Sequence, residues 1–235
     1  MCGRYTVTAD KVEFILKRFQ AELAPDFRDY APRYNVAPAQ LVPGIVSRED
    51  GKRYLTNLFW GLTPPWAEKE GSKYSTQINI RNDTIEKNKF FRSLLLGNRC
   101  IFVADGFYEW QVPEGLEKKP LPKGVRKTPY RIVFKNGDLF PVAGLWRTRM
   151  DGEKTILTGA IITTDPNTLM KPIHNRMPVI LDDDGLKHWL DPEYKNFDQL
   201  RLYLGPFPDA KMKAYPVSTA VNNARIDSAV IIEPM

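Results

Sequence analysis

The chain has 235 residues, which is enough for one large domain or two small ones. It carries 34 Lys and Arg against 28 Asp and Glu, and this net charge of +6 favours a polyanionic partner. The two cysteines are too few for a disulfide framework. No apolar run reaches the ~18–20 residues of a membrane span, and no hydrophobic signal segment is found. We therefore expect a soluble protein of a reducing compartment.

The first five residues, Met1-Cys2-Gly3-Arg4-Tyr5, carry the most distinctive chemistry of the chain. If Met1 is removed, Cys2 has an α-amine and a thiol on adjacent carbons, with ordinary pKa values of about 7.7–8.0 and about 8.5. Such a pair condenses with an aldehyde, first as an imine and then as a thiazolidine ring. The alternative is that Cys2 is a small buried hydrophobic residue.

In the first third of the chain, apolar periodicity predicts a helix over 11–23, with Thr8 as its N-cap. Two prolines and an asparagine make 31–38 a predicted loop. Strands are predicted over 40–47 and 53–60, joined by a hairpin turn.

A proline-stiffened turn follows, with Trp60 and Trp66 at its two ends. Aromatic side chains held on a loop can stack on nucleic-acid bases, which contributes about 1–3 kcal/mol per base. The alternative is that both indoles cover the core.

The middle of the chain predicts a second helix that ends at Gly97, then a buried strand over 99–104 with Cys100 in the core. Glu109 follows between aromatic residues. Desolvation there would raise the pKa of its carboxyl and make it a general acid. A solvated glutamate on an edge strand is the alternative.

A Pro- and Lys-rich connector over 111–129 precedes further strands at 130–134, 139–146 and 154–164, and a helix is expected near 198–204. Many short strands with hairpin signals and a few amphipathic helices predict an α+β fold. We expect a single domain over 1–235 with a mostly antiparallel, partly barrel-like sheet.

Only two histidines are present, and His174 is the stronger candidate for catalysis, because it lies in a loop between prolines and just before Arg176. His188 is expected at the surface of a short helix. No dinucleotide fingerprint, P-loop or nucleophile elbow occurs, and the scattered Cys and His residues do not form a zinc motif. No cofactor or metal is expected.

On the residues alone, three interpretations remain open. Cys2 could trap an aldehyde. It could form a hydrolase dyad with His174 and turn over an amide. Finally, the chain could be a non-catalytic nucleic-acid-binding module in which Cys2 is incidental.

Several motifs together resemble the SOS response-associated peptidase (SRAP) family, in family order over nearly the whole chain. They are Met1-Cys2-Gly3-Arg4-Tyr5, Tyr34-Asn35-Val36-Ala37-Pro38, Trp60-Gly61-Leu62-Thr63-Pro64, Asn79-Ile80-Arg81, Ala104-Asp105-Gly106-Phe107-Tyr108-Glu109-Trp110, Ala143-Gly144-Leu145-Trp146, His174-Asn175-Arg176-Met177-Pro178, and Val217-Ser218 with Val221-Asn222. Ile80 departs from the family, which often has Ala there, and a Glu is more usual at Asp83.

The resemblance implies a monomeric sensor of abasic sites in single-stranded DNA that forms a thiazolidine crosslink through Cys2. It implies removal of its own Met1, some lyase activity, and no membrane partner. The protein would act in the cytoplasm at the nucleoid in a bacterium, or in the nucleus of a eukaryote.

The resemblance also implies residue roles. Asn79 would orient the Cys2 amine, Glu109 would transfer protons, and His174 would assist ring opening. The remaining predicted residues would bind DNA, the arginines through phosphates and the others through bases: Arg4, Arg81, Arg176, Pro38, Trp60 and Trp66.

Overall fold

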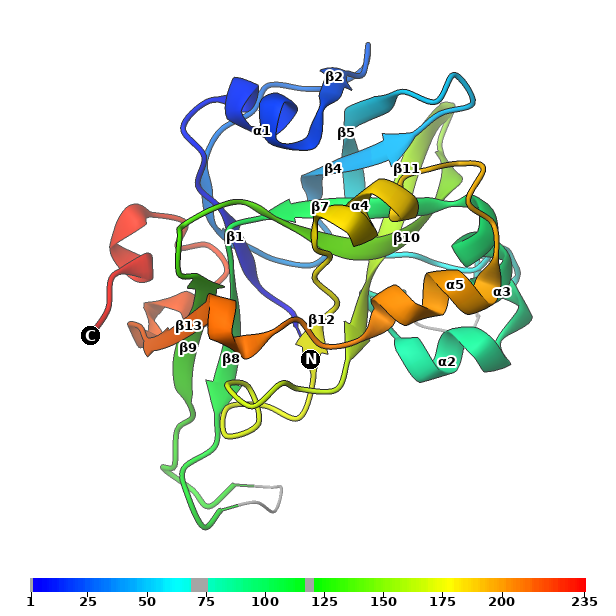
Figure 1. Ribbon diagram of the computed structural model, residues 1–235. Coiled ribbons are helices and arrows are strands. Elements are labelled where there is room, and N and C mark those ends of the chain that lie inside the picture. Colours follow the sequence, from blue (N-terminus) through cyan, green and yellow to red (C-terminus); the bar gives the residue numbers. More distant parts are fainter. Residues whose placement is uncertain (1, 69–75, 117–120) are drawn as a thin grey trace.

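The structure is a computed structural model that describes residues 2–68, 76–116 and 121–235 (Figure 1). Met1, and residues 117–120 of the predicted connector 111–129, lie outside the described residues. Two β-sheets form the body and short helices lie at its periphery, which confirms the predicted α+β class (Figure 1). Within the described ranges, no helix is long and apolar enough to cross a membrane.

The elements follow one another with strands in the majority. The strands are β1 Tyr5–Val7, β2 Ala21–Leu23, β3 Arg33–Val36, β4 Leu41–Ser47, β5 Arg53–Trp60, β6 Asn79–Arg81, β7 Arg99–Ala104, β8 Gly106–Gln111, β9 Thr128–Phe134, β10 Phe140–Asp151, β11 Lys154–Thr164, β12 Met177–Pro178 and β13 Met212–Pro216. The helices are α1 Val12–Phe19, α2 Asn82–Lys87, α3 Lys89–Gly97, α4 Asp183–Trp189 and α5 Phe197–Leu200.

The larger sheet closes into a ring. β11 pairs antiparallel with β10 and parallel with β5, and the antiparallel pairs β10–β7, β7–β4 and β4–β5 complete the circuit. The smaller sheet has the order β13-β9-β8-β1-β3 and is antiparallel. The predicted mostly antiparallel, partly barrel-like sheet is therefore confirmed.

The interior of the ring is filled by Phe102, which is fully buried. Its ring lies so close to β10 that a Cβ at Gly144 would be 2.6 Å from Phe102 Cε2. At Gly159 on β11 a Cβ would be 3.1 Å from Cζ of the same ring. A side chain at position 144 would collide with this ring and one at position 159 would be crowded by it, which favours glycine on both strands.

The first predicted helix is shorter than expected. α1 ends at Phe19 because Gln20 adopts a left-handed conformation with a φ of 51°, and the chain continues as β2, which pairs with β5. Its predicted apolar face is confirmed, since Ile15 and Phe19 are buried. Thr8 is not the N-cap: its Oγ1 donates to Asp105 Oδ2 at 2.6 Å instead.

The strands predicted over 40–47, 53–60 and 99–104 are confirmed. Two other predictions need correction. The predicted loop 31–38 contains β3, which forms because β1 offers it a pairing edge. The second helix is two helices, since Asn88 interrupts it and caps α3 by accepting from the N–H groups of Phe90 and Phe91. The expected helix near 198–204 begins as α5 and continues as a 3-10 turn.

A buried polar network ties β1 to the rest of the smaller sheet. Asp105, at the corner between β7 and β8, accepts from the side chains of Thr6 and Thr8. Its Oδ1 also lies 3.0 Å from Nη2 of Arg131 on β9, and the side chains of both ions are under 10% exposed, at 8% and 9%. A Cβ at Gly106 would lie 2.8 Å from Thr6 Oγ1, so the network requires glycine beside it.

We expect Asp105→Ala to lower the free energy of unfolding by about 3–5 kcal/mol, because it leaves the Arg131 guanidinium buried without its counter-charge. Urea denaturation followed by circular dichroism measures this. The exposed Asp29 supplies the control, since Asp29→Ala should stay within about 0.5 kcal/mol of the parent. Equal losses in the two variants would show that the network does not hold β1.

Candidate active site

Cys2 lies just before β1 and is 1% exposed. Asn79, the first residue of β6, donates from Nδ2 to the Cys2 carbonyl oxygen at 2.9 Å. Since β6 pairs with β11, this bond joins the start of the chain to the closed ring of strands. The Asn79 Oδ1 atom is buried, and no hydrogen-bond partner for it is found among the described residues. An acceptor is therefore available next to the cysteine.

Glu109 lies on β8, which is the neighbour of β1 in the smaller sheet. It is 2% exposed, and burial raises the pKa of its carboxyl to about 7. Burial, followed by the charge of Glu109, raises the pKa of the Cys2 thiol. The predicted desolvation of Glu109 is confirmed, and the alternative of a solvated edge-strand glutamate is wrong.

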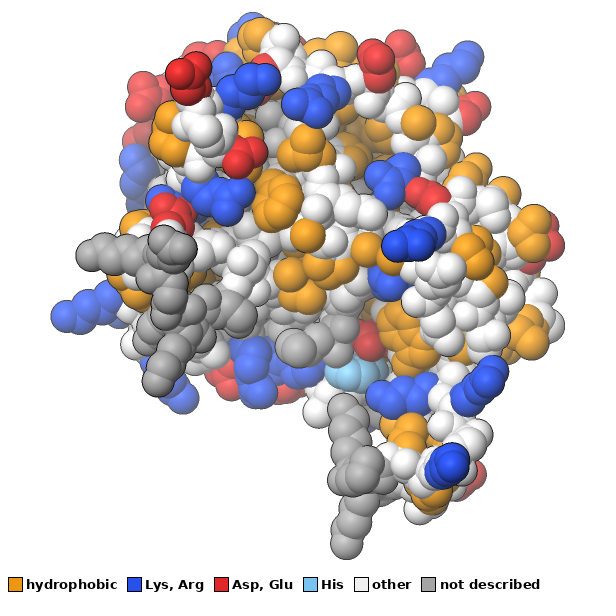
Figure 2. Space-filling model, turned by 180° about the vertical axis from the view of Figure 1, so that it is seen from behind, with side chains coloured by type: hydrophobic (Ala, Val, Ile, Leu, Met, Phe, Trp, Pro, Cys, Tyr) orange, Lys and Arg blue, Asp and Glu red, His pale blue; other side chains and the backbone are white. Residues whose placement is uncertain are grey.

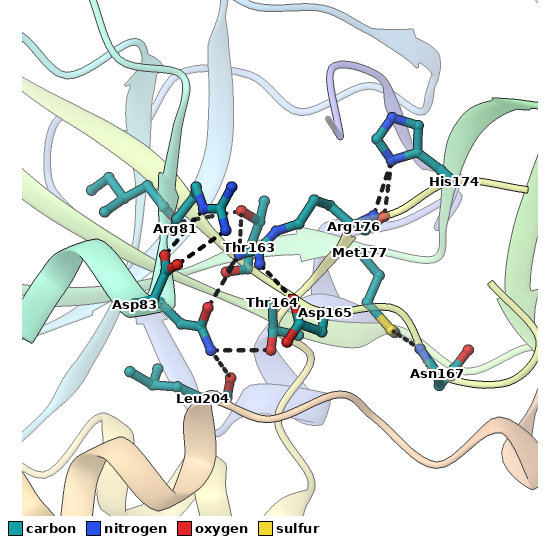
Figure 3. A network of polar contacts seen from close by, with 12 residues as sticks. Arg81, Asp83, Thr163, Thr164, Asp165, Asn167, His174, Arg176, Met177 and Leu204 are labelled. Atoms are coloured by element: carbon teal, nitrogen blue, oxygen red, sulfur yellow. Dashed lines mark hydrogen bonds and ion pairs between the residues drawn. The ribbon is translucent and has the colours of Figure 1, made fainter. Parts of the chain in front are cut away.

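His174 faces this glutamate. Its Nε2 lies 3.8 Å from Glu109 Oε2. Its Nδ1 lies against the backbone of Arg176, 3.1 Å from the N–H and 3.3 Å from the carbonyl oxygen (Figure 3), so Nε2 is the ring nitrogen that is directed to Glu109. The other histidine, His188, belongs to α4 and contacts Asp184 and Tyr194 instead.

The four predicted catalytic residues thus make two contacts, one between Asn79 and Cys2 and one between His174 and Glu109. Asn79 holds the backbone of Cys2, and His174 lies beside Glu109, whose charge acts on the Cys2 thiol. The arrangement places a buried cysteine near a buried carboxyl whose pKa is raised and a partly exposed imidazole. In the described part of the chain, no group of three or more His, Cys, Asp and Glu side chains is placed to hold a metal ion.

Two of the predicted phosphate-binding arginines are paired with acids (Figure 3). Arg81 is exposed, and its Nε and Nη2 donate to the two carboxylate oxygens of Asp83 at 3.1 and 3.0 Å. Arg176 is only 7% exposed and donates to Asp165 and Asn82. A phosphate can reach Arg176 only if the ion pair with Asp165 opens.

Arg4 is bound differently. Its Nη1 donates to Asn35 Oδ1 and to the Val221 carbonyl oxygen, both at 2.8 Å. These partners belong to motifs that carried the family resemblance, but the sequence suggested no role for Asn35 or for Val221-Asn222. The pairing could not be read from the sequence, because 217 positions separate Arg4 from Val221.

The two tryptophans of the proline-stiffened turn lie in different environments. Trp60 has no exposed surface, donates from Nε1 to the Ile78 carbonyl oxygen and packs on Tyr5, so stacking on bases does not fit its position. Trp66 is 48% exposed and packs edge-on against Phe90. Of the two indoles, only Trp66 is accessible. Pro38 is partly exposed.

Basic side chains are visible around the one histidine seen on the face opposite to the view of Figure 1, and an acidic side chain lies next to it (Figure 2). This distribution fits the net charge of +6. Acidic side chains are also visible elsewhere on this face (Figure 2).

The chain was compared with known proteins. A family model described as SOS response associated peptidase (SRAP) matches residues 1–224. The chain is 40% identical over 234 residues to the abasic site processing protein YoqW of Bacillus subtilis (strain 168), with 99% of both chains covered. It is 38% identical over 230 residues to the abasic site processing protein HMCES of Xenopus tropicalis, with 86% of this chain and 67% of that protein covered.

Solved structures agree with these matches. A protein from Bacteroides thetaiotaomicron superposes with a TM-score of 0.81 at 25% identity over 100% of both chains. A phage-related protein from Bordetella bronchiseptica gives 0.71 at 27% identity over 93% of this chain and 95% of that one. With its motifs, its fold and the residues gathered around Cys2, the chain belongs to the SOS response-associated peptidase (SRAP) family.

Proposed function

We propose that the protein captures abasic sites in single-stranded DNA as a covalent thiazolidine at Cys2, once its own Met1 has been removed. The observation that carries this proposal is the group formed by Cys2, Asn79, the buried Glu109 and the partly exposed His174 beside it. The names of the relatives YoqW and HMCES, both abasic site processing proteins, support the same substrate.

The chemistry requires an aldehyde, which the ring-opened deoxyribose of an abasic site supplies at C1′. The Cys2 amine adds to C1′ to give a carbinolamine, and loss of one water gives an imine. The Cys2 sulfur then adds to the imine carbon while the thiol proton passes to nitrogen, which closes the five-membered ring. The DNA strand stays intact, and one water is released.

The raised pKa of about 7 suits Glu109 to both proton-transfer directions near neutral pH. As a base it opens the sugar ring, and as an acid it protonates the departing hydroxyl of the carbinolamine. His174, whose Nε2 lies 3.8 Å from Glu109 Oε2, assists ring opening. The same acid–base pair would serve the removal of Met1.

The environment of the thiol favours aldehyde capture over the hydrolase alternative. A cysteine hydrolase needs a thiolate, so its cysteine has a lowered pKa beside a histidine. Here burial and Glu109 raise the pKa of Cys2, and the thiol remains protonated until the imine forms. The imine also acidifies the neighbouring C2′ protons, so we include strand cleavage by β-elimination as a minor lyase activity.

DNA contacts follow from exposure and charge. Arg4 and Arg81 contact phosphates beside the lesion, and Arg176 joins them when its pair with Asp165 opens. Trp66 stacks on a neighbouring base, and Pro38 lies against the strand.

Replacing the thiol while keeping the amine separates the two steps of the reaction. Cys2→Ser should form only an imine with an oligonucleotide that carries an aldehydic abasic site, since its hydroxyl cannot close a thiazolidine. The imine should hydrolyse during denaturing electrophoresis unless borohydride is present. Cys100→Ala, which removes the other buried cysteine, is the matched control and should crosslink stably. A stable Cys2→Ser adduct without borohydride would exclude the thiazolidine.

Glu109→Gln should slow crosslinking by about 100-fold or more, because the amide cannot transfer protons. Affinity for an oligonucleotide with a tetrahydrofuran abasic analogue, which has no aldehyde, should be unchanged. Time courses on gels and fluorescence anisotropy measure the two quantities. Equal crosslinking rates in parent and variant would remove Glu109 from the mechanism.

Glu109→Gln should also change the free energy of unfolding in a way that depends on pH, and the raised pKa of Glu109 determines the sign of this change. The folded-state pKa of Glu109, about 7, lies above the unfolded value. As pH rises from about 4.5 through 7, the unfolded state loses its proton first, so the parent loses stability relative to Glu109→Gln. The advantage of the variant should grow by about 2 kcal/mol between pH 5 and pH 8, whereas a constant difference would contradict the desolvation of Glu109.

A further inference from the structure

Arg4 is held in place without losing its charge. Its Nη1 donates to Asn35 Oδ1 and the Val221 carbonyl oxygen, and its Nη2 lies 3.5 Å from the Asn222 carbonyl oxygen. All three acceptors are uncharged, and no ion pair with a described acid is formed. The Nε–H and one Nη2–H have no acceptor among the residues that the structure describes.

This arrangement contrasts with the other two candidate arginines (Figure 3). In Arg81 the Nε–Nη2 edge, which is the edge that suits a bidentate phosphate, is already taken by Asp83. In Arg176 the Nη1 and Nη2 groups are bound to Asp165, Asn82 and Thr163. Arg4 alone of the three keeps an open Nε–Nη2 edge and an uncompensated charge in the described structure.

Asn35 determines this geometry. It is fully buried, and while its Oδ1 accepts from Arg4, its Nδ2 donates to the carbonyl oxygens of Val221, Asn223 and Ile226 at 3.3, 3.1 and 2.8 Å. One side chain therefore fixes both the guanidinium and the C-terminal turn that supplies the other two acceptors. Asp227 ties the same C-terminal segment to β3, because its Oδ1 accepts from the backbone N–H groups of Tyr34 and Asn35.

Asn222 fixes the turn from the other side. Its Oδ1 accepts from the indole Nε1 of Trp110 at 2.6 Å, and its own carbonyl oxygen faces Arg4. Trp110 is the residue after Glu109 on β8, so this bond attaches the turn to the strand that carries the proton-transfer residue. The turn is thus anchored at a buried point, Asn35, and at a surface point, Trp110.

We propose that Asn35 and Asn222 are positioning residues that hold Arg4 with its Nε–Nη2 edge open for one phosphate of the bound single strand. The inference rests on the proposed function for the nature of the ligand. The C-terminal turn then contributes to DNA binding indirectly, because the turn contacts Arg4 and Arg4 contacts the phosphate.

The first test is non-covalent binding of a fluorescein-labelled single strand with a tetrahydrofuran abasic analogue, measured by anisotropy over a range of salt concentrations. Asn222→Ala should weaken binding about five-fold, because the open edge of Arg4 is no longer fixed. It should also flatten the plot of log affinity against log salt by up to about 0.7, the share of one phosphate contact. Arg4→Gln removes the guanidinium itself and therefore shows the largest loss of affinity and the largest flattening of the salt plot to be expected.

A double variant shows whether Asn222 acts through Arg4. Arg4→Gln with Asn222→Ala should bind as weakly as Arg4→Gln alone, whereas additive losses would overturn the proposal. Asn223→Ala alters the same turn at a side chain that accepts a hydrogen bond from the backbone N–H of Arg225, and it should bind like the parent. An Asn222→Ala affinity equal to that of Asn223→Ala would also overturn it.

Asn35→Asp tests the buried anchor in a different way. This variant keeps the acceptor oxygen but gives Arg4 a carboxylate partner like those of Arg81 and Arg176, so binding of the single strand should weaken. A thermal melt of the variant reports whether the fold is kept. If this variant does not fold, Asn222→Ala at the exposed anchor decides. Crosslinking to an aldehydic abasic site, measured in parallel, separates the proposed function from the positioning role. If the parent does not crosslink, the proposed function is contradicted. If the parent crosslinks and Asn222→Ala binds DNA as tightly as the parent, only the positioning role is contradicted.

Discussion

The buried pair of Asp105 and Arg131 is the constraint on which the site depends. β1 is only three residues long and pairs with β3 and β8 at few positions. Asp105 binds the side chains of Thr6 and Thr8, and Arg131 on β9 compensates the buried carboxylate. Once β1 is fixed in this way, Cys2 lies where Asn79 can bind its carbonyl oxygen. Cys2 is thereby buried like a core residue.

Burial also sets the chemistry of the site. Because water is excluded, the pKa of Glu109 rises to about 7, and the pKa of the Cys2 thiol rises as well. The raised pKa disfavours the resting thiolate that a cysteine hydrolase would need. Away from Glu109 the charge is positive: Arg81 is exposed, and the partly exposed Arg4 is bound by uncharged acceptors only.

The sequence predicted the class of fold, most strands and the residues that meet around Cys2, because these follow from local periodicity and from ordered motifs. It failed where distant segments decide the structure. The loop expected over 31–38 is partly a strand because β1 pairs with it. Trp60 was a candidate for stacking on bases, yet the closed ring of strands buries it. The pair of Asp105 and Arg131, 26 positions apart, leaves no local pattern that could predict it.

The most direct test of the account is the intact mass of the purified protein, alone and after mixing with a single strand that carries one aldehydic abasic site. The account predicts a protein without Met1 and a stable adduct equal to protein plus DNA less one water, absent in Cys2→Ala. A protein that retains Met1 and forms no adduct would contradict it and would favour a non-covalent DNA-binding protein.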